Sequence, residues 1–313
     1  MLVVGPNLSV DQTVGVPRLR VGEIHRVPTI VKLAGGKGAN AARAMRILGA
    51  APLLIGFAGG PIGEQLAAYL RADGIAHHLV PTSAETRVCF SIADAATDQQ
   101  TEFYEAGAGV TQEEVRELLA AVEMRVRAGE WVVLTGSLPR GAPEDLYARC
   151  IDIAHRAGAH VILDARGAAL TAGLRAVPDL VKVNRGELAE CASRTLESVE
   201  QVAEAAAALG TSMGAIITLG GEGAVVVGER RRSLVRPPAI AVVSPVGSGD
   251  ATAAGIAVGL TEGRDLAEAG RMGVAAGTAN ALHLGAARFT REEFTRVLAG
   301  CTITDLPTRA AGV

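Results

Sequence analysis

The sequence places a glycine-rich turn and a carboxylate directly before a long apolar segment. Gly247, Ser248, Gly249 and Asp250 precede the residues Ala251–Gly255, which are small or apolar. Amide groups at a helix N-terminus point outward and are reinforced by the helix dipole, so such a turn can bind a phosphate. Asp250 could then accept the proton of a hydroxyl that attacks the bound phosphorus. Alternatively, Asp250 only caps the helix.

A second glycine-rich turn opens another helix and carries one of only three lysines in the chain. Residues 35–40 read Gly-Gly-Lys-Gly-Ala-Asn. The G-x-G-x-x-A spacing that starts at Gly36 partly matches a dinucleotide fingerprint, but the next acidic residue is Glu64, which lies too far along the chain. The chain also has no P-loop motif. We therefore interpret this turn, with Lys37 and Asn40, as a site for a polyhydroxylated or phosphorylated ligand.

Polar residues also follow three expected strands. Asn184 and Glu187 could reach a hydrated Mg²⁺ and phosphate oxygens, or they could simply cap a helix. The turn from Thr218 to Gly223 ends a strand where α/β proteins often bind nucleotides, but it could be a plain hairpin turn. Ser137 could bond a ligand or belong to a structural turn.

Alternating strands and helices are expected to position these residues. The sequence predicts strands over 131–135, 161–164, 180–183 and 215–219, a hairpin over 224–227 and 233–235, and helices over 143–158, 201–209, 249–262 and 266–284. This order predicts a parallel sheet covered on both faces, in a doubly wound sandwich. Residues 11–31 and 86–105 alternate without a helical period, so we expect inserted antiparallel strands there.

Composition excludes several classes of protein. The 313 residues carry a net charge of −3, which argues against a nucleic-acid-binding protein. No apolar run reaches about 18 residues, so no membrane span is expected. We see no secretory signal, and the four cysteines are widely separated, which is typical of a reducing cytoplasmic location rather than of disulfides or zinc.

The order and spacing of the motifs carry more information than any one motif. They comprise Asn7-Leu-Ser-Val-Asp11, Gly35-Gly-Lys-Gly-Ala-Asn-Ala-Ala-Arg43, the glycine cluster 56–63, Thr86-Arg87, Thr101-Glu102, Gly136-Ser-Leu-Pro-Arg-Gly141, Asn184-Arg-Gly-Glu187 and Val246-Gly-Ser-Gly-Asp250. Together they resemble the PfkB (ribokinase-like) family of sugar kinases, in particular its branch of 1-phosphofructokinase and tagatose-6-phosphate kinase.

This resemblance implies a three-layer α/β/α sandwich of residues 1–10, 32–85 and 106–313, with a discontinuous β lid of residues 11–31 and 86–105. It implies an ATP- and Mg²⁺-dependent kinase that phosphorylates a ketohexose phosphate, without nucleic-acid or membrane partners, and a homodimer formed through the lid. The alternatives are a kinase for a free sugar or nucleoside, and a non-catalytic regulator that binds sugar or nucleotide on the same fold.

The resemblance also implies a role for each motif. Asp250 would be the general base, beside an anion hole of Gly247, Ser248 and Gly249. Sugar hydroxyls would be bound by Asp11, Gly36, Asn40 and Ser137, and the substrate's own phosphate by Lys37 and Arg87. Glu187 would act on Mg²⁺ through water. The nucleotide site would be lined by Lys182, Asn184, Thr218, Gly220, Gly223 and Asn280.

Four positions depart from the family pattern. Val183 replaces the usual Pro between Lys182 and Asn184, which is a mild change. Ser248 replaces the usual Ala but keeps the backbone amide, so the anion hole should survive. Arg166 stands where the family has a Ser, so it could add a phosphate contact or block a hydroxyl contact. Leu8 replaces the Pro of the opening motif.

Overall fold

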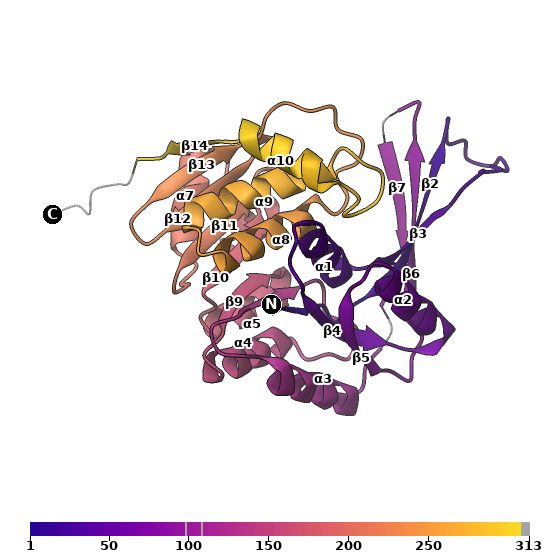
Figure 1. Ribbon diagram of the computed structural model, residues 1–313, viewed down its shortest axis with the longest axis horizontal. Helices are drawn as coiled ribbons and strands as arrows, with labels where there is room; N and C mark the ends of the chain where they lie inside the picture. Colours follow the sequence, from indigo (N-terminus) through magenta and orange to yellow (C-terminus); the bar gives the residue numbers. More distant parts are fainter. Residues whose placement is uncertain (98, 108, 308–313) are drawn as a thin grey trace.

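The computed structural model describes residues 1–97, 99–107 and 109–307. Asp98, inside the second predicted lid segment, lies outside the described residues. The same holds for Ala108 and residues 308–313 of the predicted core. The described residues form one large sheet with helices on both faces and a smaller, separate sheet at one side (Figure 1).

The large sheet has ten strands in the order β14-β13-β12-β11-β10-β9-β8-β1-β4-β5. From β11 to β5 all neighbouring strands are parallel, whereas β12, β13 and β14 add an antiparallel edge. Their bounds are β1 Leu2–Val4, β4 Leu53–Ala58, β5 Ala76–Pro81, β8 Trp131–Thr135, β9 His160–Asp164, β10 Leu180–Asn184, β11 Gly214–Thr218, β12 Ala224–Gly228, β13 Arg232–Arg236 and β14 Thr302–Asp305. The predicted parallel sheet is therefore confirmed.

Two layers of helices cover this sheet, each over its own apolar core. One layer contains α1 Lys37–Ile47, α2 Gly60–Ala72, α8 Ser248–Thr261, α9 Leu266–Asn280 and α10 Arg291–Gly300. The other contains α3 Gln112–Arg125, α4 Leu146–Arg156, α5 Gly167–Arg175, α6 Arg185–Cys191 and α7 Val199–Ala207. Between β11 and β12 lies a short 3₁₀ turn, Gly220–Glu222. The helix expected over 143–158 is shorter than predicted, and α9 ends at Asn280 rather than at residue 284.

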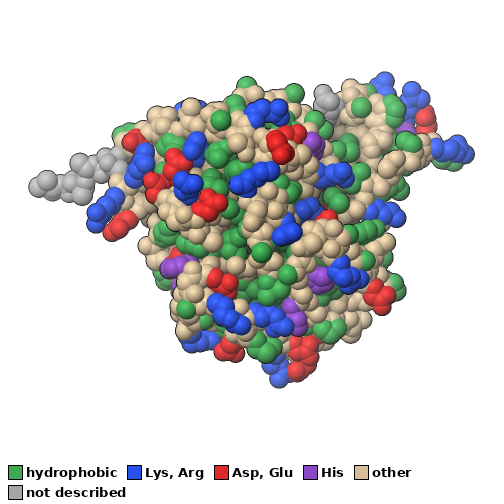
Figure 2. All heavy atoms as spheres, in the orientation of Figure 1, with side chains coloured by type: hydrophobic (Ala, Val, Ile, Leu, Met, Phe, Trp, Pro, Cys, Tyr) green, Lys and Arg blue, Asp and Glu red, His purple; other side chains and the backbone are tan. Residues whose placement is uncertain are grey.

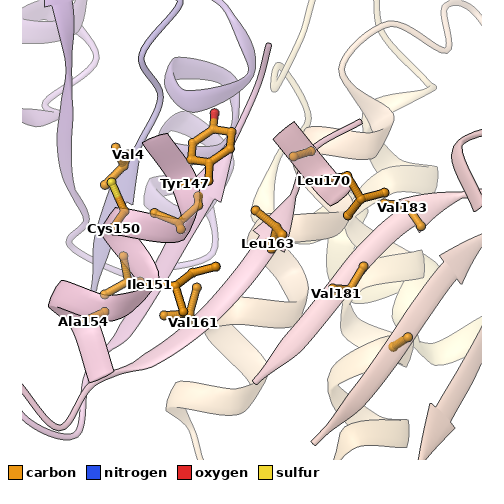
Figure 3. Packing of buried hydrophobic residues seen from close by; sticks show 14 of the residues in the cluster. Val4, Tyr147, Cys150, Ile151, Ala154, Val161, Leu163, Leu170, Val181 and Val183 are labelled. Atoms are coloured by element: carbon orange, nitrogen blue, oxygen red, sulfur yellow. The ribbon is translucent and has the colours of Figure 1, made fainter. Parts of the chain in front are cut away.

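Successive side chains of the central strands alternate between the two apolar cores. Val161 and Leu163 of β9 face the layer of α4 and α5, whereas Ile162 between them faces the opposite core. Side chains two residues apart share a face of a strand, so a continuous apolar run buries both faces of a parallel sheet. Figure 3 shows Leu163 and Val181 of the sheet with Ile151 of α4 and Leu170 of α5 in this packing.

The small sheet joins two separated segments in the order β3-β2-β6-β7. It contains β2 Ser9–Val16, β3 Val31–Gly35, β6 Arg87–Asp94 and β7 Gln99–Tyr104. We expected antiparallel strands, and β2–β3 and β6–β7 do pair in this way. The central pair differs, because β2 runs parallel to β6 from Ser9 beside Arg87 to Val16 beside Asp94. Two insertions that each fold back on themselves can meet along strands of the same direction, which no local pattern reveals.

Charged side chains of both signs are interspersed over the face shown in Figure 2. This distribution agrees with the small net charge of the sequence. Among the residues that the structure describes, no helix is long and apolar enough to span a membrane.

The close packing of α5 on β9 gives a test of the core. A methyl group at Gly173 would lie 2.6 Å from Leu163 Cδ2, so Gly173→Ala should destabilise the protein by about 1–3 kcal/mol through overpacking. Leu163→Ala alone should cost about 2–5 kcal/mol. In the double variant the new methyl group occupies the vacated space, so the loss measured by urea unfolding should be smaller than the sum. Additive losses would show that these two sites do not contact each other.

Candidate active site

A cleft of about 1060 Å³ lies where the carboxyl ends of the parallel strands, the N-termini of α1 and α8 and the small sheet meet. Ligands of open α/β sheets commonly bind at this edge. All site residues predicted from the sequence line this cleft except Asn280. The motifs that are far apart in sequence therefore converge on a single site.

Asp250 lies in the first turn of α8 and is 6% exposed. Burial raises its pKa to about 6, against the opposing effects of the Lys37 ammonium and of the Asn40 hydrogen bond. Asn40 Nδ2 donates to Asp250 Oδ2 at 2.9 Å. The N-cap position belongs to Gly247, not to Asp250, so the alternative that Asp250 only caps the helix is wrong. A buried carboxylate with this pKa is suited to act as a general base near neutral pH.

Asp164, which was not among the predicted site residues, interacts with the same two lysines that act on this base. Its carboxylate is completely buried, and Oδ1 lies 3.4 Å from Lys37 Nζ and 3.3 Å from Lys182 Nζ. Thr135 Oγ1 donates to Oδ2 at 2.9 Å. Burial alone would raise the pKa of Asp164, but the two ammonium groups hold it below its usual range. The one feature of the sequence that could have pointed to Asp164 is an acidic residue at the end of an apolar strand.

The glycine turn before α8 has the geometry of an anion site. Gly247 adopts a left-handed conformation with φ of 80°, and a methyl group there would overlap Ala286. Ser248 N donates to Pro245 O at 3.1 Å, so this amide is already engaged. The amides of Gly247 and Gly249 belong to the end of the helix where N–H groups have no acceptor within the helix. Lys182 Nζ lies 3.1 Å from the position of a Gly249 methyl group, so its charge adjoins the turn.

The small sheet closes the other end of the cleft. Burial raises the pKa of Asp11, while the Ser9 hydrogen bond and the Arg87 guanidinium oppose this rise. A methyl group at Gly35 would overlap the Asp11 carboxyl, which explains why glycine stands there. Arg87 Nη2 donates to Asn7 O at 3.1 Å, whereas its buried Nε has no acceptor among the described residues. Buried donors normally have partners, so this group is free to bind a ligand.

Lys37 and Arg87 both line the cleft, and Lys37 forms an ion pair with Asp164 at 3.4 Å. The carboxylates of Asp164, Asp250 and Glu187 all favour the charged form of Lys37, and Asp164 has the largest effect in raising its pKa above the usual range. Ser137 remains at the Asn7 end of the cleft, where Asn7 Nδ2 donates to Ser137 Oγ at 3.0 Å. Lys37 and Lys182 thus share the Asp164 carboxylate, whereas Arg87 comes from β6 of the small sheet.

Asn184 and Glu187 line the cleft and also form a capping box at the start of α6. Glu187 N donates to Asn184 Oδ1 at 2.9 Å, and Asn184 N donates to Glu187 Oε2 at 2.8 Å. The turn with Thr218, Gly220 and Gly223 lies beside them in the cleft wall. A methyl group at Gly223, where φ is 101°, would overlap the Val235 carbonyl. Capping and cleft lining are therefore combined in the same residues.

Asn280 differs from the prediction, because its side chain is completely buried and does not reach the cleft. Its Nδ2 donates to Val246 O at 2.8 Å and to Ser248 Oγ at 3.1 Å, and its Oδ1 accepts from Ala287 N at 2.7 Å. Asn280 therefore braces the turn before α8. Nearby positions on α9, Gly277, Thr278 and Ala281, line the cleft instead.

The described residues contain no group of three His, Cys, Asp or Glu side chains that could hold a metal ion. This does not exclude a Mg²⁺ that is held mainly by substrate phosphates and water, since one protein carboxylate is then sufficient. The capping box uses only Oε2 of Glu187. Glu187 therefore fits the part of a single carboxylate that acts directly or through water.

Comparisons with known proteins agree with this geometry. Residues 6–292 match the model of the pfkB family of carbohydrate kinases. The 1-phosphofructokinase of Rhodobacter capsulatus is 36% identical over 272 residues, which cover 86% of each chain. Phosphofructokinase-2 of Escherichia coli in complex with fructose-6-phosphate is 29% identical, with a TM-score of 0.89 over 96% of this chain and 98% of that chain.

Ribokinase of Arabidopsis thaliana, complexed with ribose and ATP, is 24% identical, with a TM-score of 0.72 over 95% of this chain and 98% of that chain. This likeness concerns the fold, and it confirms the predicted ribokinase-like arrangement of a mainly parallel sheet between helices with a small separate sheet. The extent of the family match, read together with the converging motifs, shows that the chain belongs to the pfkB family of carbohydrate kinases.

Proposed function

We propose that this carbohydrate kinase transfers the γ-phosphoryl group of ATP to a hydroxyl of a fructose phosphate, giving a fructose bisphosphate and ADP. The buried Asp250 beside the glycine turn of α8 is the observation that carries the proposal. The fructose phosphate is supported by the names of the relatives and by the unpartnered Arg87 Nε at the lid end of the cleft.

The acceptor sugar would lie between the small sheet and α1. Asp11, Gly36, Asn40 and Ser137 would contact its hydroxyls, and Arg87 would bind the phosphate that it already carries. A guanidinium presents paired donors that match a phosphate. This arrangement would leave one sugar hydroxyl facing Asp250.

The reaction would then need little besides positioning and charge stabilisation. Asp250 accepts the proton of the attacking hydroxyl while the new O–P bond forms and the bond between the γ-phosphorus and the bridging oxygen breaks. The amides of Gly247 and Gly249, with Lys37 and Lys182, would stabilise the negative charge on the transferred group.

The nucleotide would lie along Lys182, Asn184, Thr218, Gly220 and Gly223. Glu187 is the residue that we assign to Mg²⁺. A bound Mg²⁺ neutralises charge on the phosphates.

We further propose that the small sheet is a lid and that a second copy of the chain covers it. Phe103 and Tyr104 of β7 are 60% and 56% exposed, and Val21 and Ile24 in the connection between β2 and β3 are exposed as well. Successive strand residues face opposite sides, and Tyr104 lines the cleft, so we assign the outward-facing Phe103 to this contact. The cytoplasmic location stays a prediction from the sequence.

Asp250→Asn tests the base. The variant should lose about 10²- to 10⁴-fold in kcat, because its amide cannot accept the proton. Its melting temperature at about pH 7.5 should be unchanged or higher, because a carboxyl whose folded pKa is raised costs stability as pH rises through that value. Asp265→Asn, at the exposed N-cap of α9, should leave kcat unchanged. Near-normal turnover of Asp250→Asn would show that Asp250 is not the general base.

Arg87→Met tests the phosphate on the substrate. Losing a charge-assisted hydrogen bond should raise the KM for fructose phosphates by about 10- to 100-fold and leave the KM for ATP unchanged. The ratio of kcat/KM for fructose phosphates to kcat/KM for free fructose should fall. Arg140→Met, at an exposed arginine outside the cleft, serves as the control. A wild-type enzyme that turns over only free sugars or nucleosides would contradict the proposal.

Phe103→Asp tests the lid contact. A carboxylate in an apolar interface carries a large desolvation cost, so light scattering should show a dimer for the wild type and a monomer for the variant. Met124→Asp on α3, also exposed, should stay dimeric. The lid contact is wrong if both variants keep the wild-type mass.

A further inference from the structure

A buried arginine lies behind the active site and has no role in the function proposed so far. Arg43 of α1 is 6% exposed and does not line the cleft. Its Nε donates to Asp73 Oδ2 at 2.8 Å and its Nη2 to Ala34 O at 2.6 Å. The guanidinium is therefore held from the end of α2 and from β3.

The remaining terminal nitrogen faces the catalytic side. Arg43 Nη1 donates to Asn40 Oδ1 at 3.4 Å, and Asn40 Nδ2 in turn donates to Asp250 Oδ2 at 2.9 Å. These two bonds fix the orientation of the Asn40 amide. In the opposite orientation, the amide oxygen would face the carboxylate and the amide NH₂ would face the guanidinium, and both contacts are repulsive.

Arg43 also reaches the wall of the anion site. The same Nη1 lies 3.4 Å from Ala286 O. Ala286 packs directly against Gly247, and its neighbour Ala287 donates to the Asn280 side chain that braces the turn. One guanidinium thus connects the helix that carries Asn40 with the loop that supports the turn before α8.

We infer that Arg43 is a positioning residue, which holds the Asn40 amide so that it donates to Asp250 and keeps the base ready to accept a proton. The role of Asp250 as base rests on the proposed function, but the hydrogen-bond chain does not. Arginine suits this position because its planar fork makes several bonds in fixed directions, whereas lysine offers a single point charge.

The charged and polar groups around Asp250 influence its pKa in opposite directions. Lys37 and Lys182 favour the ionised form, Asp164 opposes it, and the Asn40 amide favours it. Losing the Asn40 bond should therefore raise the pKa of Asp250 above its value of about 6. Because this hydrogen bond favours the ionised carboxylate, we expect an upward shift of about one pH unit when the amide is released.

The test compares Arg43→Met with Arg46→Met, an exposed arginine on the same helix. Carbon-13 NMR of labelled aspartate gives the pKa of Asp250 directly, and the pH profile of kcat gives its kinetic counterpart. In Arg43→Met both should move up by about one unit, so kcat falls about fivefold at pH 6 and little above pH 8. Arg46→Met should behave as the wild type. An unchanged Asp250 pKa in folded Arg43→Met overturns the inference.

Two further variants distinguish orientation of the Asn40 amide by Arg43 from an effect of the Arg43 charge and from a general loss of structure. Arg43→Lys keeps the charge but not the fork, so it should shift as Arg43→Met does; a wild-type pKa there would refute the role of the amide. Added to Asn40→Ala, Arg43→Met should cause no further shift, and an additive shift would likewise refute it.

Folding and function are kept apart in this design. If Arg43→Met does not fold, Asp73→Asn loosens the guanidinium from the partly exposed end of α2 and should raise the pKa by a smaller amount, whereas no shift would count against Arg43. A wild type that turns over no fructose phosphate would contradict the proposed function, while the NMR titration would still decide the role of Arg43.

Discussion

A carboxylate without any access to water is the constraint on which the active site depends. Asp164 ends β9 inside the protein, and a buried charge of this kind is tolerated only when cationic partners are held close. The partners come from separate elements, Lys37 from the start of α1 and Lys182 from β10. The ion pairs of Asp164 therefore tie the start of α1 and β10 to the end of β9, and they hold two positive charges near Asp250.

Much of the local structure and the choice of cleft residues could be predicted from the sequence, because glycine turns and strand ends are short-range signals. The role of Asn280 could not, since only the packing of α9 decides which of its faces meets the cleft. The parallel pairing of β2 with β6 depends on two distant segments, and the grouping of Lys37 with Asp164 depends on the sheet order. Arg43 stood inside a quoted motif, but only its burial shows that it faces inward.

The choice between helix capping and ligand binding, which the sequence left open, has different answers at different turns. At α6 the two roles coincide, because a capping box orders Asn184 and Glu187 in the cleft wall. At α8 the cap is a glycine, which leaves Asp250 without a capping duty. Residues that stabilise a helix end can thus preorganise a site, since their rotamers are fixed before any ligand arrives.

The parallel pairing of β2 and β6 affects how the protein reaches its active form. Asp11 and Arg87 lie on these two neighbouring strands, yet all of β3, α1, β4, α2 and β5 lies between them along the chain. Long-range strand pairing must wait for the intervening chain to be ordered, because closing that loop costs entropy before any contact is gained. The proposed sugar pocket is complete only once this pairing has formed, so a folding intermediate that lacks the pairing has no complete pocket.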